Sequence, residues 1–351
     1  MNLKKGFEKF LDNKVNLDKT RIDRLKSAHN ELRNVLTGQE EVKKIYVNDY
    51  LQGSYKLKTG IKPVNGGEYD VDVILELNLK DDNGNYIMNG YSVTNWLYDI
   101  LTNIPAYKDK VEYPPKSRSV RVKYADTLRL DISPVHFNND EDPVLIVPDW
   151  KPTNPKGFKK WCVSVQENSK QQFYFVTRIL KYWRDIQTGV GSHPKSILLT
   201  TLIGKNISTK EGITANESLV ITMKNLNKYL QGFSEVPEIK NPSLSTENLA
   251  ESFSYSDFVS FKSRFKTATE KITEAFNEED EAKSIKILNS AELFKDTFPV
   301  TLYESEMKKA MDMAESIKSG KAGITQMGVP TTVLGLIREN IPSGYGSHGD
   351  Y

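Results

Sequence analysis

Two aspartates one residue apart stand in an apolar, strand-like segment of the chain. The segment reads "EYDVDVILEL", residues 68–77, and its branched aliphatic residues predict a β-strand. Side chains at positions i and i+2 of a strand face the same side, about 6.5–7 Å apart, so Asp70 and Asp72 are expected to project together. Two adjacent carboxylates repel each other unless a hard cation such as Mg²⁺ lies between them. The pair therefore predicts a divalent-metal site.

A third carboxylate occupies a later strand-like segment, "TLRLDISPVHF", residues 127–137. Apolar and polar residues alternate here, which places Asp131 on the polar face of the predicted strand. If the two strands lie side by side, three carboxylates can hold two metal ions about 3.5–4 Å apart. Such a metal pair activates an attacking hydroxyl and stabilises a leaving pyrophosphate. The pattern predicts nucleotidyl transfer.

A Gly-Ser pair, Gly53 and Ser54, precedes the first of these strands. Glycine lets backbone N–H groups approach a phosphate closely, and Ser54 is expected to cap a helix and to offer a hydroxyl. Taken alone, a Gly-Ser pair or an Asp-x-Asp is more often a solvated surface feature. Their combination favours a triphosphate site, to which nearby lysines add positive charge; these are Lys56, Lys58 and Lys62. We expect Glu68 to have a surface role.

The segments "QGSYKLKTGIKP", "EYDVDVIL" and "LRLDISPV" together resemble the DNA polymerase beta-like nucleotidyltransferase superfamily. More narrowly, they resemble the CD-NTases, the cGAS- and DncV-like cyclic-oligonucleotide synthases of bacterial CBASS anti-phage defence. The matching motifs lie within residues 52–134. The resemblance implies that Gly53 and Ser54 bind the phosphates of ATP or another nucleoside triphosphate. It also implies that Asp70, Asp72 and Asp131 are catalytic and bind two Mg²⁺ ions, with Asp131 activating the acceptor hydroxyl.

Two further segments, "FVTRILKYWRD" and "HPKSILLTTLIGK", resemble the helix lysine and the downstream serine that contact the triphosphate in these enzymes. The resemblance implies this role for Lys181 and Ser196. Helical spacing predicts that Phe173 and Trp183 are buried while Lys181 lies on a basic face. That face could grip phosphate, or it could be a solvated helix surface.

The elements that must position these residues follow from hydrophobic periodicity. Residues 3–45 predict two amphipathic helices, residues 46–147 a sheet with one helix over 91–104, and the proline-rich residues 148–157 a hinge or linker. Further helices are predicted over 165–187, 194–205, 215–232, 246–278, 280–291 and 303–319. The fold class is α+β: a nucleotidyltransferase core with a mixed sheet, followed by an all-helical second domain. We expect domains over 1–160 and 161–335, the latter on the nucleotide lid side, and a flexible tail over 336–351.

Composition excludes several classes of protein. The chain has 351 residues, of which 48 are basic and 46 acidic, so its formal net charge is only +2. A polymerase on long nucleic acid usually needs a basic stripe, and this balance argues against one. The one cysteine, Cys162, excludes a disulfide framework and predicts a buried thiol in a cytoplasmic protein. The chain has no run of 18 apolar residues and lacks the Cys/His zinc insert that docks duplex DNA in animal relatives.

These observations predict an enzyme that converts nucleoside triphosphates into a cyclic di- or trinucleotide messenger and releases pyrophosphate. A linear nucleotidyltransferase acting on RNA ends or on a protein would share every metal ligand. A non-catalytic nucleotide-binding scaffold would keep only the fold. The resemblance also implies partners: an effector protein that binds the product, and a HORMA-type regulator or a conjugation machinery acting on the C-terminus. We expect a structural role for His136.

Overall fold

The computed structural model describes residues 3–64, 66–116, 118–125, 127–137, 144–146, 150–188, 194–299, 311–319, 323–324 and 330–331. The chain divides into two compact units, Met1–Phe298 and Pro299–Tyr351. In its described part, the second unit holds a helix over 311–318 and the strand pair β9 (Gly323–Ile324) and β10 (Pro330–Thr331). The predicted flexible tail, 336–351, lies outside the described residues.

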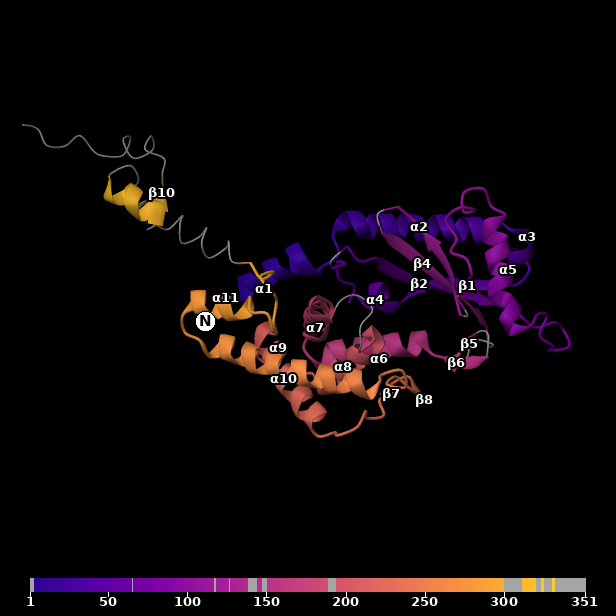
Figure 1. The fold of residues 1–351 in the computed structure, drawn as a ribbon. Helices are drawn as coiled ribbons and strands as arrows, with labels where there is room; N and C mark the ends of the chain where they lie inside the picture. The colour runs from indigo at the N-terminus through magenta and orange to yellow at the C-terminus, as the bar shows by residue number, and fades with distance from the viewer. Residues whose placement is uncertain are drawn as a thin grey trace, which may run out of the picture. The chain divides into compact units, whose positions relative to one another are not determined.

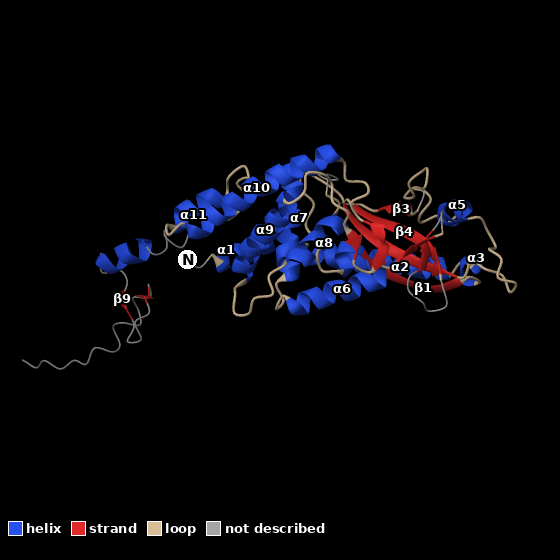
Figure 2. Cartoon of the chain, turned by 90° about the horizontal axis from the view of Figure 1, so that it is seen from below, coloured by secondary structure: helices blue, strands red, loops and turns tan. Residues whose placement is uncertain are grey.

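A mixed sheet, six-stranded over the described residues, forms the centre of the first unit (Figures 1 and 2). Its strands are β1 (Tyr46–Gln52), β2 (Tyr69–Leu77), β3 (Val120–Lys123), β4 (Leu128–His136), β5 (Val144–Ile146) and β6 (Lys151–Thr153). The order is β1-β2-β4-β5-β6, and β3 pairs with β4. β2 and β4 run parallel, and every other neighbouring pair is antiparallel. The predicted α+β fold with a mixed sheet is confirmed.

One face of the sheet carries the hydrophobic core of this part of the chain. Strand side chains on that face alternate with polar ones, as the period of two requires. Two amphipathic helices cover it, α2 (Lys19–Thr37) and α5 (Gly90–Thr102), with the short α3 (Glu40–Lys43) following α2. The buried cluster includes Leu25, Leu32, Val71, Val73, Leu97, Val122, Leu130 and Ile132. The opposite face of the strands is therefore left for polar chemistry.

Helices make up most of the rest of the first unit, and a short β-hairpin lies between two of them. They are α6 (Pro155–Asn168), α7 (Phe173–Thr188), α8 (Ser196–Asn206), α9 (Ala215–Gln231), α10 (Tyr255–Asn277) and α11 (Glu281–Leu288), with a hairpin of β7 (Lys240–Asn241) and β8 (Leu244–Asn248) between α9 and α10. Figure 1 shows α2 on one side of the sheet and α6 and α8 on the other. Thr214 and Glu217 form a capping box at the start of α9, and Ser254 caps α10.

The predicted hinge over 148–157 is wrong in its described part. Residues 151–153 form the edge strand β6, and Pro155 occupies the first turn of α6, whose N-cap Asn154 accepts a hydrogen bond from the Gly157 N–H at 2.7 Å. Proline fits both an edge strand and a first helical turn, so a proline-rich segment need not be a linker. The single helix predicted over 165–187 is accordingly two helices, α6 and α7.

The N-terminal segment joins the helical part of the unit through aromatic packing. It forms α1 (Lys4–Phe10) and the π-helical turn η1 (Leu11–Val15). Phe7 and Phe10 are fully buried and pack with their rings 4.9 and 5.2 Å from that of Phe298. The predicted domain division stays a proposal. Its first boundary, residue 160, lies inside α6, and its second boundary, residue 335, lies outside the described residues. None of the described helices is both long and apolar enough to cross a lipid bilayer.

Candidate active site

Four side chains line up across the polar face of the sheet. In the strand registers, Gln52 of β1 pairs with Asp72 of β2, Asp72 pairs with Asp131 of β4, and Asp131 pairs with Arg121 of β3. Register partners on neighbouring strands point to the same side of a sheet. Asp70 lies two residues before Asp72 and shares that side. The three predicted carboxylates therefore come together on the face opposite the core.

Asp72 lies against the glycine of the Gly-Ser pair. Gly53 has a φ of +67°, a left-handed conformation that favours glycine, and a Cβ added there would lie 2.0 Å from Asp72 Oδ2. Burial, followed by the negative charges of Asp131 and Asp70, raises the pKa of Asp72 to about 6. Burial likewise raises the pKa of Asp70. Burial and like charge therefore disfavour the ionised form of Asp72, and a bound cation would offset that cost.

Asp131 has different neighbours. Arg121 donates from Nε to Oδ1 at 2.7 Å and from Nη2 to Oδ2 at 2.8 Å, and Lys116 Nζ donates to Oδ2 at 2.9 Å. Burial alone would raise the pKa of Asp131, but the hydrogen bonds from Arg121 and Lys116 hold it below its usual value. With Asp131 paired in this way, the described residues contain no group of three or more His, Cys, Asp or Glu side chains that could hold a metal ion.

The donor set nevertheless suits Mg²⁺. Carboxylate oxygens are the ligands that this hard cation prefers, and it usually binds through one or two of them together with substrate phosphates. Asp70 and Asp72 meet that requirement as they stand. Asp131 would become a further ligand if its oxygens were released from Arg121 and Lys116.

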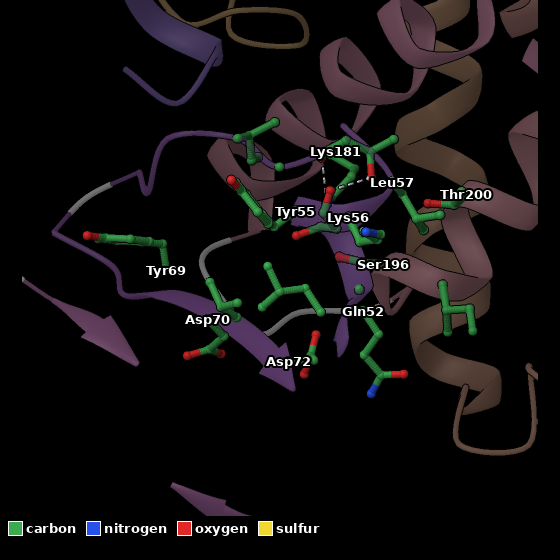
Figure 3. Close-up of a pocket in the computed structure, with 18 of the residues that line it drawn as sticks. Gln52, Tyr55, Lys56, Leu57, Tyr69, Asp70, Asp72, Lys181, Ser196 and Thr200 are labelled. Atoms are coloured by element: carbon green, nitrogen blue, oxygen red, sulfur yellow. Dashed lines mark hydrogen bonds between the residues drawn. The ribbon is translucent and has the colours of Figure 1, made fainter. Parts of the chain in front are cut away.

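A large cavity opens beside the Asp70 and Asp72 carboxylates. Its volume is about 780 Å³, within the range of small-molecule sites. Figure 3 shows Asp70 and Asp72 on the strand side and Lys181 and Ser196 on the helix side. The polar lining includes Gln52, Ser54, Tyr55, Lys56, Lys62, Glu68, Asp70, Asp72, Asn154, Lys156, Lys159, Lys181, Arg184, Asp185, Lys195, Ser196, Thr200 and Asn241. Asp131 is not part of this lining, so the predicted third ligand lies outside it, paired with Arg121 and Lys116.

Lys181 sits at the junction of the sheet and the helices. It is 4% exposed, and its Nζ donates to the backbone oxygen of Thr59 at 2.9 Å. Burial lowers the pKa of Lys181 to about 8, with the charge of Arg184 acting in the same direction. The alternative of a solvated helix surface is therefore wrong for this lysine. Phe173 and Trp183 are buried as predicted.

Ser196 is the first residue of α8 and lies in the cavity wall. Its hydroxyl accepts hydrogen bonds from Arg184 Nη1 and Nη2, each at 3.3 Å. Arg184 also donates to the Pro194 oxygen at 2.8 Å and to Asp185 Oδ1 at 2.7 Å. Arg184 was missed in the sequence, although its position three residues after Lys181 places it on the same face of α7.

Ser54 does not cap a helix. It is the second residue of α4 (Gly53–Lys56), whose N-cap position is Gln52 with no side-chain cap bond. Phosphate binding here would rest on the backbone N–H groups and the hydroxyl, because a four-residue helix has little dipole. Lys56 and Lys62 both line the cavity; Lys56 is exposed, and the Lys62 Nζ donates to the backbone oxygens of Asp12 and Asn13.

Three further expectations concern residues around the site. His136 is buried and its Nδ1 accepts a hydrogen bond from the Leu79 N–H at 3.3 Å, which confirms a structural role. Cys162 is buried, and burial raises the pKa of its thiol to about 12, so it is no nucleophile. Glu68 is half exposed, yet it forms ion pairs with Arg129 at 2.5 Å and with Arg121 at 3.8 Å. It belongs to the charged face rather than to a free surface.

Residues 1–166 match the domain family described as Second Messenger Oligonucleotide or Dinucleotide Synthetase. A curated relative, a cyclic AMP-AMP-AMP synthase from an Acinetobacter species, is 26% identical over 96% of this chain and 97% of its own length.

Solved structures show the same fold. Vibrio cholerae DncV cyclic AMP-GMP synthase in complex with a linear intermediate aligns at a TM-score of 0.65 and 18% identity, over 83% of this chain and 94% of that one. The Escherichia coli CdnC:HORMA-deltaN complex aligns at a TM-score of 0.64 and 19% identity, over 84% of this chain and 98% of that one.

Proposed function

We propose that the chain is a CD-NTase, a cGAS- and DncV-like nucleotidyltransferase, and that its residues make a cyclic oligonucleotide from nucleoside triphosphates. The chemistry is nucleotidyl transfer with release of pyrophosphate at each bond. The observation that carries the proposal is the juxtaposition of the Asp72 carboxylate with the Gly53–Ser54 turn at the mouth of the cavity. That arrangement brings an acidic cation site and a phosphate site together.

Each cavity residue then has a role that its surroundings support. Gly53 and Ser54 bind the triphosphate through backbone N–H groups and the hydroxyl. Lys181, held by Thr59 and shielded from water, neutralises phosphate charge where a low local dielectric strengthens the interaction. Ser196 donates its hydroxyl to a phosphate oxygen while it accepts from Arg184.

Asp70, Asp72 and Asp131 would hold two Mg²⁺ ions. When bound, these ions lower the cost of deprotonating the acceptor ribose hydroxyl and neutralise charge on the transferring phosphoryl group. The raised pKa of Asp72 supports this assignment, because burial and the charges of Asp131 and Asp70 disfavour an ionised carboxylate that a bound cation would favour. Asp131 would accept the proton of the acceptor hydroxyl once its oxygens are free.

The cellular role is proposed from the family. We propose that the product is a messenger in anti-phage signalling, read by a separate effector protein. A HORMA-type regulator is supported by the structural likeness to the CdnC:HORMA-deltaN complex. Conjugation at the C-terminus would act on a segment outside the described residues. The single buried thiol, Cys162, suits the reducing cytoplasm.

The experiment that tests the activity uses the full chain with Mg²⁺ and all four nucleoside triphosphates. We expect products that resist phosphatase, whose masses, measured by mass spectrometry, give ring size and bases. The Asp72→Asn variant should form none. The matched control is Asp99→Asn, which changes an exposed carboxylate on α5 outside the cavity, and it should retain wild-type turnover.

Other outcomes point to the two alternatives. Phosphatase-sensitive products, or transfer only when RNA or a protein is added, would identify a linear nucleotidyltransferase. Triphosphate binding without pyrophosphate release, in a preparation that is folded by circular dichroism, would identify a non-catalytic scaffold. Either result would overturn the synthase proposal.

A further inference from the structure

Arg121 is a half-buried basic residue on the acidic face of the sheet. It lies on β3 in register with Asp131, and its side chain is only 16% exposed. The guanidinium spans three carboxylates: it binds both oxygens of Asp131, lies 3.3 Å from Asp70 Oδ2, and lies 3.8 Å from Glu68 Oε2. A planar cation placed among three carboxylates neutralises part of their negative charge, as a bound metal ion would.

The carboxylate oxygens of Asp131 cannot bind Arg121 and a metal ion at the same time. Both of its carboxylate oxygens accept from Arg121, and Oδ2 also accepts from Lys116. A bidentate arginine and a metal ion compete for the same lone pairs. Asp131 is also held away from the cavity lining, whereas Asp70 and Asp72 contribute to it. In this arrangement, both oxygens of Asp131 are occupied, whereas Asp70 meets Arg121 at only one oxygen, 3.3 Å away, and still lines the cavity with Asp72.

We infer that Arg121 is a positioning residue that acts as the resting counter-ion of the active site, occupying Asp131 in place of metal until metal and triphosphate together displace it. This inference rests on the proposed function, since it takes Asp131 as a metal ligand. Lys116 supports the same state through its hydrogen bond to Asp131 Oδ2, but it is 42% exposed and so contributes less. Arg121 thereby keeps the acidic face folded without metal and makes complete metal binding depend on substrate.

The test measures Mn²⁺ binding, by electron paramagnetic resonance, to the full chain without nucleotide and then with a nonhydrolysable ATP analogue. Arg121→Met should tighten Mn²⁺ binding without nucleotide by roughly tenfold, because Asp131 loses its competing cation. In EDTA, the Arg121→Met variant should unfold at a lower temperature than wild type, and added Mn²⁺ should restore the unfolding temperature. The matched control is Lys123→Met, on the same strand and face, which removes an exposed lysine paired with Glu112 at 3.1 Å. The control should leave Mn²⁺ affinity unchanged.

The outcomes separate this inference from the proposed function. Unchanged or weaker Mn²⁺ binding by Arg121→Met, with Asp72→Asn still abolishing binding, would overturn the role of Arg121 alone. If wild type does not bind Mn²⁺ even with nucleotide, or if Asp72→Asn binds it as wild type does, the metal site fails and the proposed function with it. Should Arg121→Met not fold, Arg121→Lys keeps the charge but loses the bidentate contact. Its Mn²⁺ affinity should exceed that of wild type, and equal affinity would overturn the inference.

Discussion

The carboxylate of Asp72 lies against the Cα of Gly53, so close that a Cβ at residue 53 would stand 2.0 Å from Asp72 Oδ2. The contact joins the turn after β1 to the polar face of β2, two neighbouring antiparallel strands. Two features require glycine at residue 53: the left-handed φ of +67° and the lack of space for a side chain. The proposed phosphate site and the proposed metal site therefore share one contact.

Gly53→Ala should abolish synthesis while the protein still folds. The left-handed conformation costs alanine about 1–2 kcal/mol, and the new methyl group must push the Asp72 carboxylate aside. The measurements are the midpoint of urea unfolding and the rate of pyrophosphate release. Gly212→Ala is the matched control, because Gly212 has a similar φ of +73° with nothing near its missing Cβ. It should lose similar stability and keep its activity; equal activity losses in both variants would contradict the specific role of the contact.

The strands that carry the site could be predicted from the sequence because their pattern is simple. β2 and β4 alternate branched apolar residues with polar ones, and this period places Asp70, Asp72 and Asp131 on one face once the strands are neighbours. The pairing of β3 beside β4 does not follow from any local pattern. "SVRVKY" predicts a strand with Arg121 on its polar face, yet only the observed register sets that arginine opposite Asp131.

The errors have equally local causes. The cluster of prolines favours a linker, although Pro152 lies in an edge strand and Pro155 in a first helical turn. The helix predicted from residue 246 begins only at Tyr255, after its Ser254 cap, because residues 244–248 pair with β7 instead. Tertiary pairing overrides local preference in both places. The burial of Lys181 cannot be predicted from the local sequence, since it depends on Thr59, which lies 122 positions earlier in the chain.

Asp72→Asn should stabilise the metal-free protein while it abolishes turnover. Burial and the charges of Asp131 and Asp70 disfavour the ionised carboxylate, which the raised pKa of Asp72 reports. A neutral amide of the same shape removes that cost, so we expect a gain of about 1–2 kcal/mol at pH 7.5 in EDTA. Urea unfolding measures it. Asp99→Asn, on the exposed face of α5, should change neither stability nor turnover; a loss of stability in Asp72→Asn would contradict the proposed repulsion.

Lys181 should make stability depend on pH at alkaline values. Its pKa is about 8 in the folded protein and 10.5 in an exposed chain, so between these values the unfolded chain binds more protons. Raising the pH through this window therefore favours the folded state, by about 1–3 kcal/mol for this one group. The measurement is the difference in unfolding free energy between wild type and Lys181→Met at pH 7.5 and pH 10. Lys205→Met, which removes an exposed lysine, should show no such trend. A difference that stays constant or falls with pH would refute the assignment.

The same Lys181→Met variant should weaken triphosphate binding. The methionine keeps the length and the burial of the side chain but removes the positive charge facing Asp72 and the cavity. We expect the KM for ATP to rise by about tenfold or more, because a charge-assisted hydrogen bond in a shielded site is lost. Steady-state kinetics of pyrophosphate release measure it. Lys205→Met should retain the wild-type KM, and an unchanged KM in Lys181→Met would remove this lysine from the binding site.

Ser196→Ala separates a structural hydroxyl from a substrate contact. Its Oγ accepts two long hydrogen bonds from Arg184, but Arg184 keeps stronger partners in the Pro194 oxygen and Asp185. The loss of stability should therefore be small, about 0.5–1 kcal/mol. If the hydroxyl also binds phosphate, the KM for ATP rises several-fold while kcat changes little, since binding of the ground state and of the transition state is weakened equally. Ser254→Ala removes a helix cap outside the cavity lining at about 1 kcal/mol, so it matches the stability loss without the kinetic effect. Equal KM values in the two variants would leave Ser196 as a partner of Arg184 alone.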